Sequence, residues 1–150
     1  MRLIAKNKKA FFNYEILESF EAGIALVGTE VKSIREGRIS LKESYAEIKS
    51  GELFLVSCHV SPYEAASQFN HDPLRPKKLL LHKKEIKRLT GKIREKGLTL
   101  IPTKVLINDK GKVKVEIGLA RGKKAYQKRE TLRERDRAKE MRTELKIRRR

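Results

Sequence analysis

The sequence has no tryptophan and a single cysteine in 150 residues. Because Cys58 has no second cysteine to pair with, no disulfide can form within the chain, and a cysteine-based zinc site would be short of ligands. The three histidines, His59, His71 and His82, show none of the spacings that place two metal ligands on one helix face. We therefore expect no metal site and no cofactor, and we expect Cys58 to be a small buried apolar side chain.

Long apolar runs and catalytic motifs are missing as well. No stretch approaches the roughly 18 apolar residues that a membrane span needs, and the N-terminus has no apolar signal-peptide block. The segment GLARGKK at 118–124 has three residues between its glycines where a P-loop has four, and Lys124 stands where Ser or Thr would bind magnesium. The sequence therefore predicts a cytoplasmic protein that contacts no membrane, is not an enzyme and has no catalytic residues.

Acidic residues are scarce relative to basic ones. Lys and Arg number 37 against 19 Asp and Glu, a formal net charge of +18, which indicates an extended polyanion as partner. With only five Phe and four Tyr, recognition of RNA shape through its backbone is favoured over base stacking. Alternatives are a charged surface without a partner, a general basic RNA-binding or ribosomal protein, and an RNA-modifying enzyme.

The first half of the chain predicts short strands around one helix. Residues 10–27 are interpreted as two strands with a turn near 18–21, and Thr29 as the cap of a short helix. Val31 and Ile34 would face the core, and Gly37 would end the helix in a left-handed conformation. Strands at 44–48 and 53–56 then flank the polar turn 49–52, which predicts a hairpin.

The second half contains the clearest periodicities. Residues 61–78 hold three prolines and no apolar repeat, which predicts an irregular segment. Ile86, Leu89 and Ile93 recur at helical spacing in a helix that begins near His82 and ends at Gly97. Alternating residues at 113–120 and a partner strand at 98–107 predict a final hairpin. The fold class is therefore mainly β with helices: an antiparallel OB-like β-barrel with two or three helices and a basic C-terminal tail.

The character of the chain changes at Arg121. Residues 121–150 contain fourteen Lys and Arg against five Asp and Glu, a net +9, so one fifth of the chain holds half of the charge. Their apolar residues are too sparse for a core, although Ala138, Met141 and Leu145 fall at helical spacing. We predict a barrel domain at 1–120 and a tail at 121–150 that is disordered when free and helical when bound.

Several segments, in order, resemble one known family. They are Asn7-Lys8-Lys9-Ala10, FEAGIAL at 20–26, GTEVKSIREG at 28–37, Ser44-Tyr45-Ala46, Asp72-Pro73 with Arg75, KLLLHKKEI at 78–86, GLTLIP at 97–102 and GLARGKKAYQKR at 118–129. The chain thereby resembles the SmpB family, the small protein B that partners transfer-messenger RNA (tmRNA) in bacterial ribosome rescue. The resemblance covers roughly residues 7–129.

The resemblance implies a barrel that binds the tRNA-like domain of tmRNA and delivers it to stalled 70S ribosomes, for rescue and tagging of incomplete peptides. It implies that the tail enters the decoding region and becomes helical there, while the ribosome performs the catalysis. We expect the protein itself to be monomeric.

Individual residues follow from the same resemblance. RNA-binding positions of the family fall on Asn7, Glu21 and Leu80, although residue pattern alone would make Leu80 a core residue and Glu21 a turn residue. Lys77 and Lys78 fit both the resemblance and the need to neutralise phosphates. The predicted ribosome-binding positions of the tail are Gly122, Lys123, Lys124, Tyr126, Lys128 and Arg129. Gln127 stands where many members have Asp, and Tyr126 where some have His; Tyr126 is the best candidate for stacking on a base.

Overall fold

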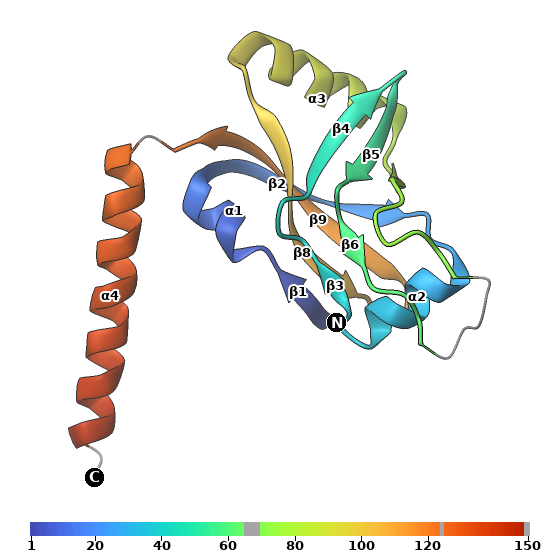
Figure 1. The fold of residues 1–150 in the computed structure, drawn as a ribbon. Helices are drawn as coiled ribbons and strands as arrows, with labels where there is room; N and C mark the ends of the chain where they lie inside the picture. The colour runs from blue at the N-terminus through green and yellow to red at the C-terminus, as the bar shows by residue number, and fades with distance from the viewer. Residues whose placement is uncertain (65–69, 124, 149–150) are drawn as a thin grey trace.

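The computed structural model describes residues 1–64, 70–123 and 125–148, and within the helix 125–148 it describes the side chains of 128–130 and 132–142. Thirteen elements follow one another in the described residues (Figure 1). They are β1 (Arg2–Lys6), α1 (Lys8–Asn13), β2 (Tyr14–Ile24), α2 (Gly28–Arg35), β3 (Ile39–Ser40), β4 (Tyr45–Lys49), β5 (Glu52–Val56), β6 (His59–Val60), β7 (Lys77–Leu80), α3 (Lys83–Lys96), β8 (Thr99–Ile107), β9 (Val113–Gly122) and α4 (Ala125–Arg148).

The strands pair antiparallel in a seven-stranded sheet of order β1-β8-β4-β5-β7-β2-β9. Because β8 also pairs with β9, the pairings run in a closed circuit from β8 through β4, β5, β7, β2 and β9 back to β8. The main hydrophobic core includes the alternate residues Val113, Val115, Ile117 and Leu119 of β9. The mainly β, antiparallel fold class predicted from the sequence is therefore confirmed.

The prediction of two strands within 10–27 is wrong. Residues 8–13 form α1 instead, because the side-chain oxygen of Asn7 accepts a hydrogen bond from the amide of Ala10 at 3.1 Å and so caps a helix. One long strand, β2, then pairs with β9 from Tyr14 to Gly23, with a bulge between Ile16 and Glu18. Residues 18–21 lie within this strand and not at a turn.

The predicted cap of the next helix is also wrong. Thr29 lies inside α2, and its hydroxyl contacts Nδ1 of His71 at 2.8 Å. The carboxylate of Glu30 reaches back to the amide of Val27 at 2.9 Å and binds the end of the helix in place of Thr29. The C-terminus is as predicted: Gly37 has a φ of +78°, where other residues are strained.

The elements with the clearest periodicity are confirmed. Helix α3 begins after His82 and ends at Gly97, whose φ of +61° is left-handed. The hairpin of β4 and β5 turns at Ser50 and Gly51, both at positive φ, as a two-residue turn of this twist requires. Strands β8 and β9 pair from Thr99 to Ile107 as the last hairpin.

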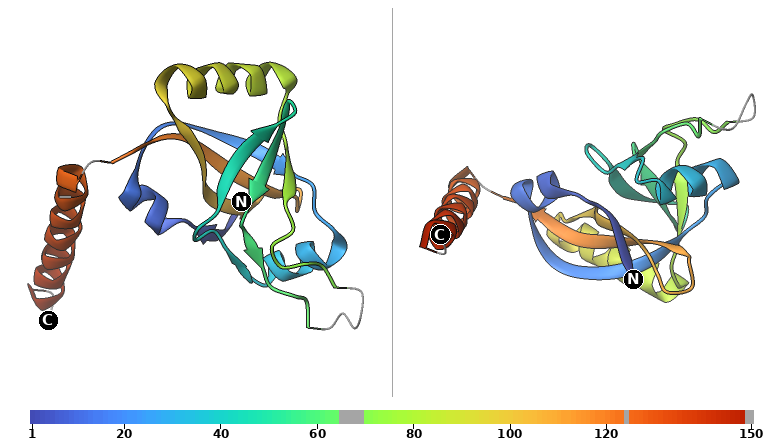
Figure 2. Two further views of the ribbon diagram at one scale, coloured as in Figure 1. Left: turned by 45° about the horizontal axis from the view of Figure 1, so that its top comes forward. Right: turned by 90° about the horizontal axis from the view of Figure 1, so that it is seen from below.

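Helix α4 projects from the body of the protein at the end of β9 (Figures 1 and 2). Its described contacts with the body include the cations of Lys128 and Arg135, which lie 6.0 and 5.8 Å from the ring centre of Phe12 in α1. Most of its described side chains are exposed. Over the described residues, no helix combines the length and apolar character of a membrane span.

Candidate nucleic-acid interface

Three of the predicted RNA-binding residues lie around one surface hollow of about 480 Å³. We call it the Leu80 hollow; it is lined chiefly by Glu21, Gly23, Lys78, Leu80, Lys83, Ile86 and Lys114. These residues come from β2, β7, β9 and the start of α3. They meet because β2 lies between β7 and β9, with Gly23 paired to Leu80 on one side and to Lys114 on the other.

Leu80 faces outward because successive residues of a strand point to opposite faces. In β7, Lys77 and Leu79 point into the protein, whereas Lys78 and Leu80 point out. The interpretation of Leu80 as a core residue is therefore wrong: its side chain is 51% exposed. A leucine held in this way presents apolar surface to a partner.

Gly23 lets the Leu80 side chain lie close against β2. A Cβ atom at position 23 would lie 3.2 Å from Cβ of Leu80, closer than side-chain atoms ordinarily pack, and 3.6 Å from Nζ of Lys114. The side chain of Leu80 and the ammonium of Lys114 therefore both lie next to the space that a side chain at position 23 would fill. The absence of a side chain at position 23 is what brings an apolar group and a cation together here.

The rest of the hollow carries charges of both signs. Nζ of Lys78 lies 3.3 Å from a carboxylate oxygen of Glu52, and both side chains are about half exposed. Such an exposed ion pair contributes little stability, so Lys78 can release Glu52 and bind another anion instead. Glu21 is exposed on β2, where its carboxylate can only accept hydrogen bonds. The hollow can therefore offer an apolar contact, cations for phosphates and the carboxylate acceptors of Glu21 and Glu52.

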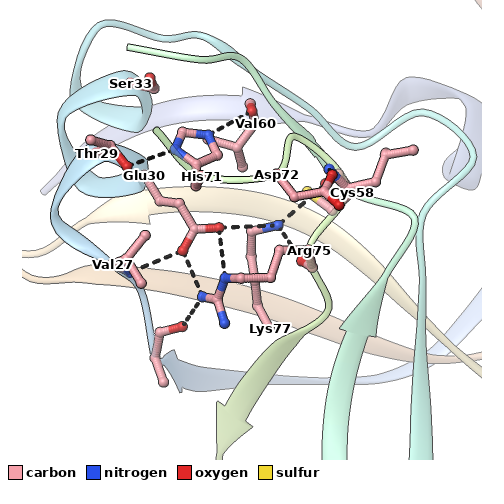
Figure 3. A network of polar contacts seen from close by, with 12 residues as sticks. Val27, Thr29, Glu30, Ser33, Cys58, Val60, His71, Asp72, Arg75 and Lys77 are labelled. Atoms are coloured by element: carbon pink, nitrogen blue, oxygen red, sulfur yellow. Dashed lines mark hydrogen bonds and ion pairs between the residues drawn. The ribbon is translucent and has the colours of Figure 1, made fainter. Parts of the chain in front are cut away.

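Lys77 differs from the prediction, because its side chain is fully buried. Its ammonium donates to the carbonyl oxygens of Arg75 at 2.7 Å and Cys58 at 3.4 Å, and lies 3.6 Å from the carboxylate of Glu30 (Figure 3). As the side chain lies here, it does not face the hollow and cannot meet a phosphate. It instead holds the segment before β7 against α2.

Glu30 is the centre of this buried network (Figure 3). Its two carboxylate oxygens accept from the guanidinium of Arg75 at 2.6 and 3.3 Å, and one of them accepts from the amide of Val27. Burial alone would raise the pKa of Glu30, but the hydrogen bonds from Arg75 and Val27 and the charges of Lys77 and Arg75 outweigh it and lower that pKa. The carboxylate therefore remains ionised and keeps both cations in place.

Two further side chains fasten the same region. His71 joins the Thr29 hydroxyl at 2.8 Å to the backbone oxygen of Val60 at 2.9 Å. Cys58 is buried as expected, and burial raises the pKa of its thiol to about 11. Within the described chain, no group of three or more His, Cys, Asp or Glu is arranged to hold a metal ion.

Asn7 lies away from the Leu80 hollow and is itself buried. Its side-chain amide donates to the backbone oxygens of Leu41 at 3.3 Å and Pro102 at 3.0 Å, and its side-chain oxygen caps α1. These three bonds occupy the polar atoms that an RNA contact would need. The structure thus gives Asn7 a clear role in joining α1 to the body.

The predicted tail residues that the structure describes follow one another where β9 ends and α4 begins (Figure 1). Gly122 ends β9, and Lys123 is bound to α1 through its amide to Asn13 at 2.8 Å and its ammonium to Phe11 at 3.0 Å. Lys124 lies outside the described residues, as does the side chain of Tyr126 on α4. Lys128 lies over Phe12, and Arg129 is exposed.

Sequence reasoning missed Lys83 and Lys114 as members of the Leu80 hollow. The alternation of β9 already pointed Lys114 outward, away from Val113 and Val115. The pairing register of β2 and β9, which places Lys114 beside Gly23, could not be predicted from the sequence.

The fold and the hollow define a basic, mainly antiparallel β protein of the RNA-binding type, with a cationic and apolar site on the sheet and a charged helix at its C-terminus. A family model described as SmpB protein matches residues 4–147. The chain belongs to the SmpB protein family.

Relatives in this family resemble the chain over nearly its whole length. A protein of Symbiobacterium thermophilum named SsrA-binding protein is 57% identical over 92% of this chain and 87% of its own length. A protein of the same name from Carboxydothermus hydrogenoformans is 57% identical over 98% of both. A solved structure described as "tmRNA-SmpB: a journey to the center of the bacterial ribosome" matches 81% of this chain and 85% of its own, with a TM-score of 0.67 and 54% identity.

Proposed function

We propose that this chain binds the tRNA-like domain of tmRNA and delivers it to stalled 70S ribosomes, where incomplete peptides are tagged and released. The observation that carries the proposal is the outward Leu80, seated over Gly23 beside the ammonium of Lys114. The names of the SsrA-binding relatives and the tmRNA-SmpB structure on the ribosome support it.

Each part of the Leu80 hollow suits RNA. The exposed leucine can pack against the face of an unstacked base or a ribose. Lys78 and Lys114 can neutralise phosphates, and Lys78 gives up only a weak surface pair with Glu52. Glu21 repels phosphate but can accept from a 2′-hydroxyl or a base amino group, which favours one orientation of the RNA.

The architecture extends the same proposal. Residues 1–120 are an OB-like barrel, which the closed circuit of strand pairings supports. Residues 121–150 are a tail, and the part of it that follows Lys123 is disordered when free and helical on the ribosome, which the mostly exposed, charged side chains described in α4 support. Arg121 and Gly122 instead pair with Glu15 and Tyr14 at the end of β9. The protein acts as a monomer in the cytoplasm and as a binding protein, with the chemistry left to the ribosome.

In this proposal the tail meets the decoding region. Its residues Gly122, Lys123, Lys124, Tyr126, Lys128 and Arg129 contact ribosomal RNA there, and the Gln127 amide takes the place of a carboxylate. The weak ring contacts of Lys128 and Arg135 with Phe12 support a helix that can leave the body.

The test is binding to the tRNA-like domain in competition with ordinary tRNA and random RNA across a salt series. Leu80→Ala is expected to weaken binding to the tRNA-like RNA, while Leu3→Ala, which shortens another exposed strand leucine, is expected not to. Selective binding near physiological salt supports the proposal. Equal loss on all three RNAs as salt rises would make the protein a general basic RNA binder.

A further inference from the structure

A groove of about 1080 Å³ lies beside α3. We call it the α3 groove. One wall is the face of α3 that carries Lys83, Lys87 and Arg94, and the other is the β4–β5 hairpin. Ile86, Ile93 and Leu98 contribute apolar surface to its lining.

The helix wall is cationic. Lys83, Lys87 and Arg94 are all exposed, and no ion pair ties any of them to a carboxylate of the described residues. On the neighbouring face the opposite holds: Arg88 and Lys92 are bound to Glu18 at 2.6 and 3.0 Å. Two cations of α3 therefore bind Glu18 within the protein, whereas Lys83, Lys87 and Arg94 line the groove without an ion-pair partner among the described residues.

The hairpin wall does not cancel this charge. It contributes Glu47 and Glu52 to the groove, but Glu52 is paired with Lys78 at 3.3 Å. Three cations thus face one uncompensated carboxylate. The excess of positive charge favours a polyanion over a neutral or basic partner.

Gly91 lies in the same face, between the lysines and Arg94. A glycine inside a helix costs about 1 kcal/mol relative to alanine. Nothing lies within 4 Å of the position that a Cβ would occupy at Gly91, so packing within the described protein does not require the missing side chain. Because Gly91 has no side chain, the backbone of a bound molecule can approach α3 closely at this point of the groove.

We propose that the α3 groove is a second contact for the RNA that occupies the Leu80 hollow, and that it binds the phosphodiester backbone with Gly91 at the point of closest approach. The inference rests on the proposed function. The two sites are continuous, because Lys83, Ile86, Gly51 and Glu52 line both. From Lys83 to Arg94 the helix extends for about 16 Å, over which a strand carries several phosphates.

The first test compares two triple variants of the full chain. Lys83→Gln/Lys87→Gln/Arg94→Gln removes the three groove cations, and Lys42→Gln/Lys96→Gln/Lys110→Gln removes three exposed lysines that line neither site. The slope of log K against log salt for the tRNA-like RNA is expected to become shallower by about 2–3 in the groove variant, as for three lost phosphate contacts. The control variant is expected to retain the wild-type slope to within about one contact.

The second test is Gly91→Ala, for which stability and affinity are expected to move in opposite directions. The substitution should raise the melting temperature by about 2–4 °C, because alanine is the better helix former. It should also weaken RNA binding by about tenfold, because the new methyl group holds the backbone away.

The outcomes separate this inference from the proposed function. If wild-type protein selects the tRNA-like RNA but the two triple variants behave alike, the groove is not an RNA contact while the proposed function stands. If the Gly91→Ala variant is more stable than wild type but binds the tRNA-like RNA with the same affinity, the RNA backbone does not approach closely at Gly91. If the wild-type chain shows no preference for the tRNA-like RNA, the proposed function fails and the groove contact fails with it.

Discussion

Lys77 and Lys78 are adjacent and chemically identical, yet the structure predicts opposite consequences for their loss. Lys77 is fully buried with its ammonium among Glu30 and two backbone oxygens. The side chain of Lys78 is 47% exposed, and among the described residues its ion pair is with Glu52. Substituting each by methionine keeps most of the aliphatic stem and removes the charge. The pair of variants therefore isolates what the two ammonium groups do.

The expected loss of stability in each variant depends on the groups that lose a hydrogen bond or an ion pair when the ammonium is removed. Lys77→Met deprives the carbonyl oxygens of Arg75 and Cys58 of a donor and Glu30 of one of its two cations. Glu30 keeps Arg75 and the Val27 amide, so we expect a loss of about 2–4 kcal/mol of stability, below the cost of an isolated buried charge. Lys78→Met removes an exposed pair and should change stability by less than about 1 kcal/mol.

Urea unfolding measures this difference directly. Lys77→Met should lower the midpoint at unchanged slope and reduce the melting temperature by about 5–15 °C. Lys78→Met should unfold like wild type but show a salt dependence of RNA binding that is shallower by about one contact. Equal midpoints for the two variants would refute the assignment of Lys77 to the buried network.

Three further outcomes follow from single sites. The hydrogen bonds from Arg88 and Lys92 lower the pKa of Glu18 from 4.5 to about 2, so its contribution to stability is present above pH 4.5 and lost as pH falls toward 2. The stability gap between wild type and Glu18→Gln should close over that window in urea titrations. Gly51→Val should cost about 1–2 kcal/mol in thermal unfolding, because a branched side chain opposes the positive φ of the hairpin turn. The Cys58 thiol, with its pKa raised to about 11 by burial, should react with a disulfide reagent at pH 8 only after denaturant is added; reaction at full rate in the native protein would contradict its burial.

The elements that could be predicted from the sequence are those in which local pattern and tertiary packing agree. The stripe of Ile86, Leu89 and Ile93 faces the core, and the alternation in β9 points the same residues inward that the sequence predicts. Helix α1 was missed because its cap, Asn7, is also held by Leu41 and Pro102, two residues from distant parts of the chain. Thr29 was misassigned because the side chain of Glu30 satisfies the helix end instead.

The candidate site was predictable in its residue types but not in its geometry. Composition and resemblance indicated lysines and an apolar position near 77–80, but they could not tell which lysine points inward. That choice depends on the register of β7 and on Glu30, a buried anion from a different element. Lys114 and Gly23 likewise join the site only through strand pairing.

The central claim is that this chain enables tmRNA to rescue stalled ribosomes, and a reconstituted tagging reaction tests it most directly. Stalled ribosomes and charged tmRNA would be combined with the full chain or with a chain ending at Lys123, which keeps β9 and the contacts of Lys123 with α1. We predict tagged peptide with the full chain only, and retained binding of the tRNA-like RNA by both. Absence of tagging with the folded full chain would contradict the proposed function, and tagging by the shortened chain would contradict the role assigned to the tail.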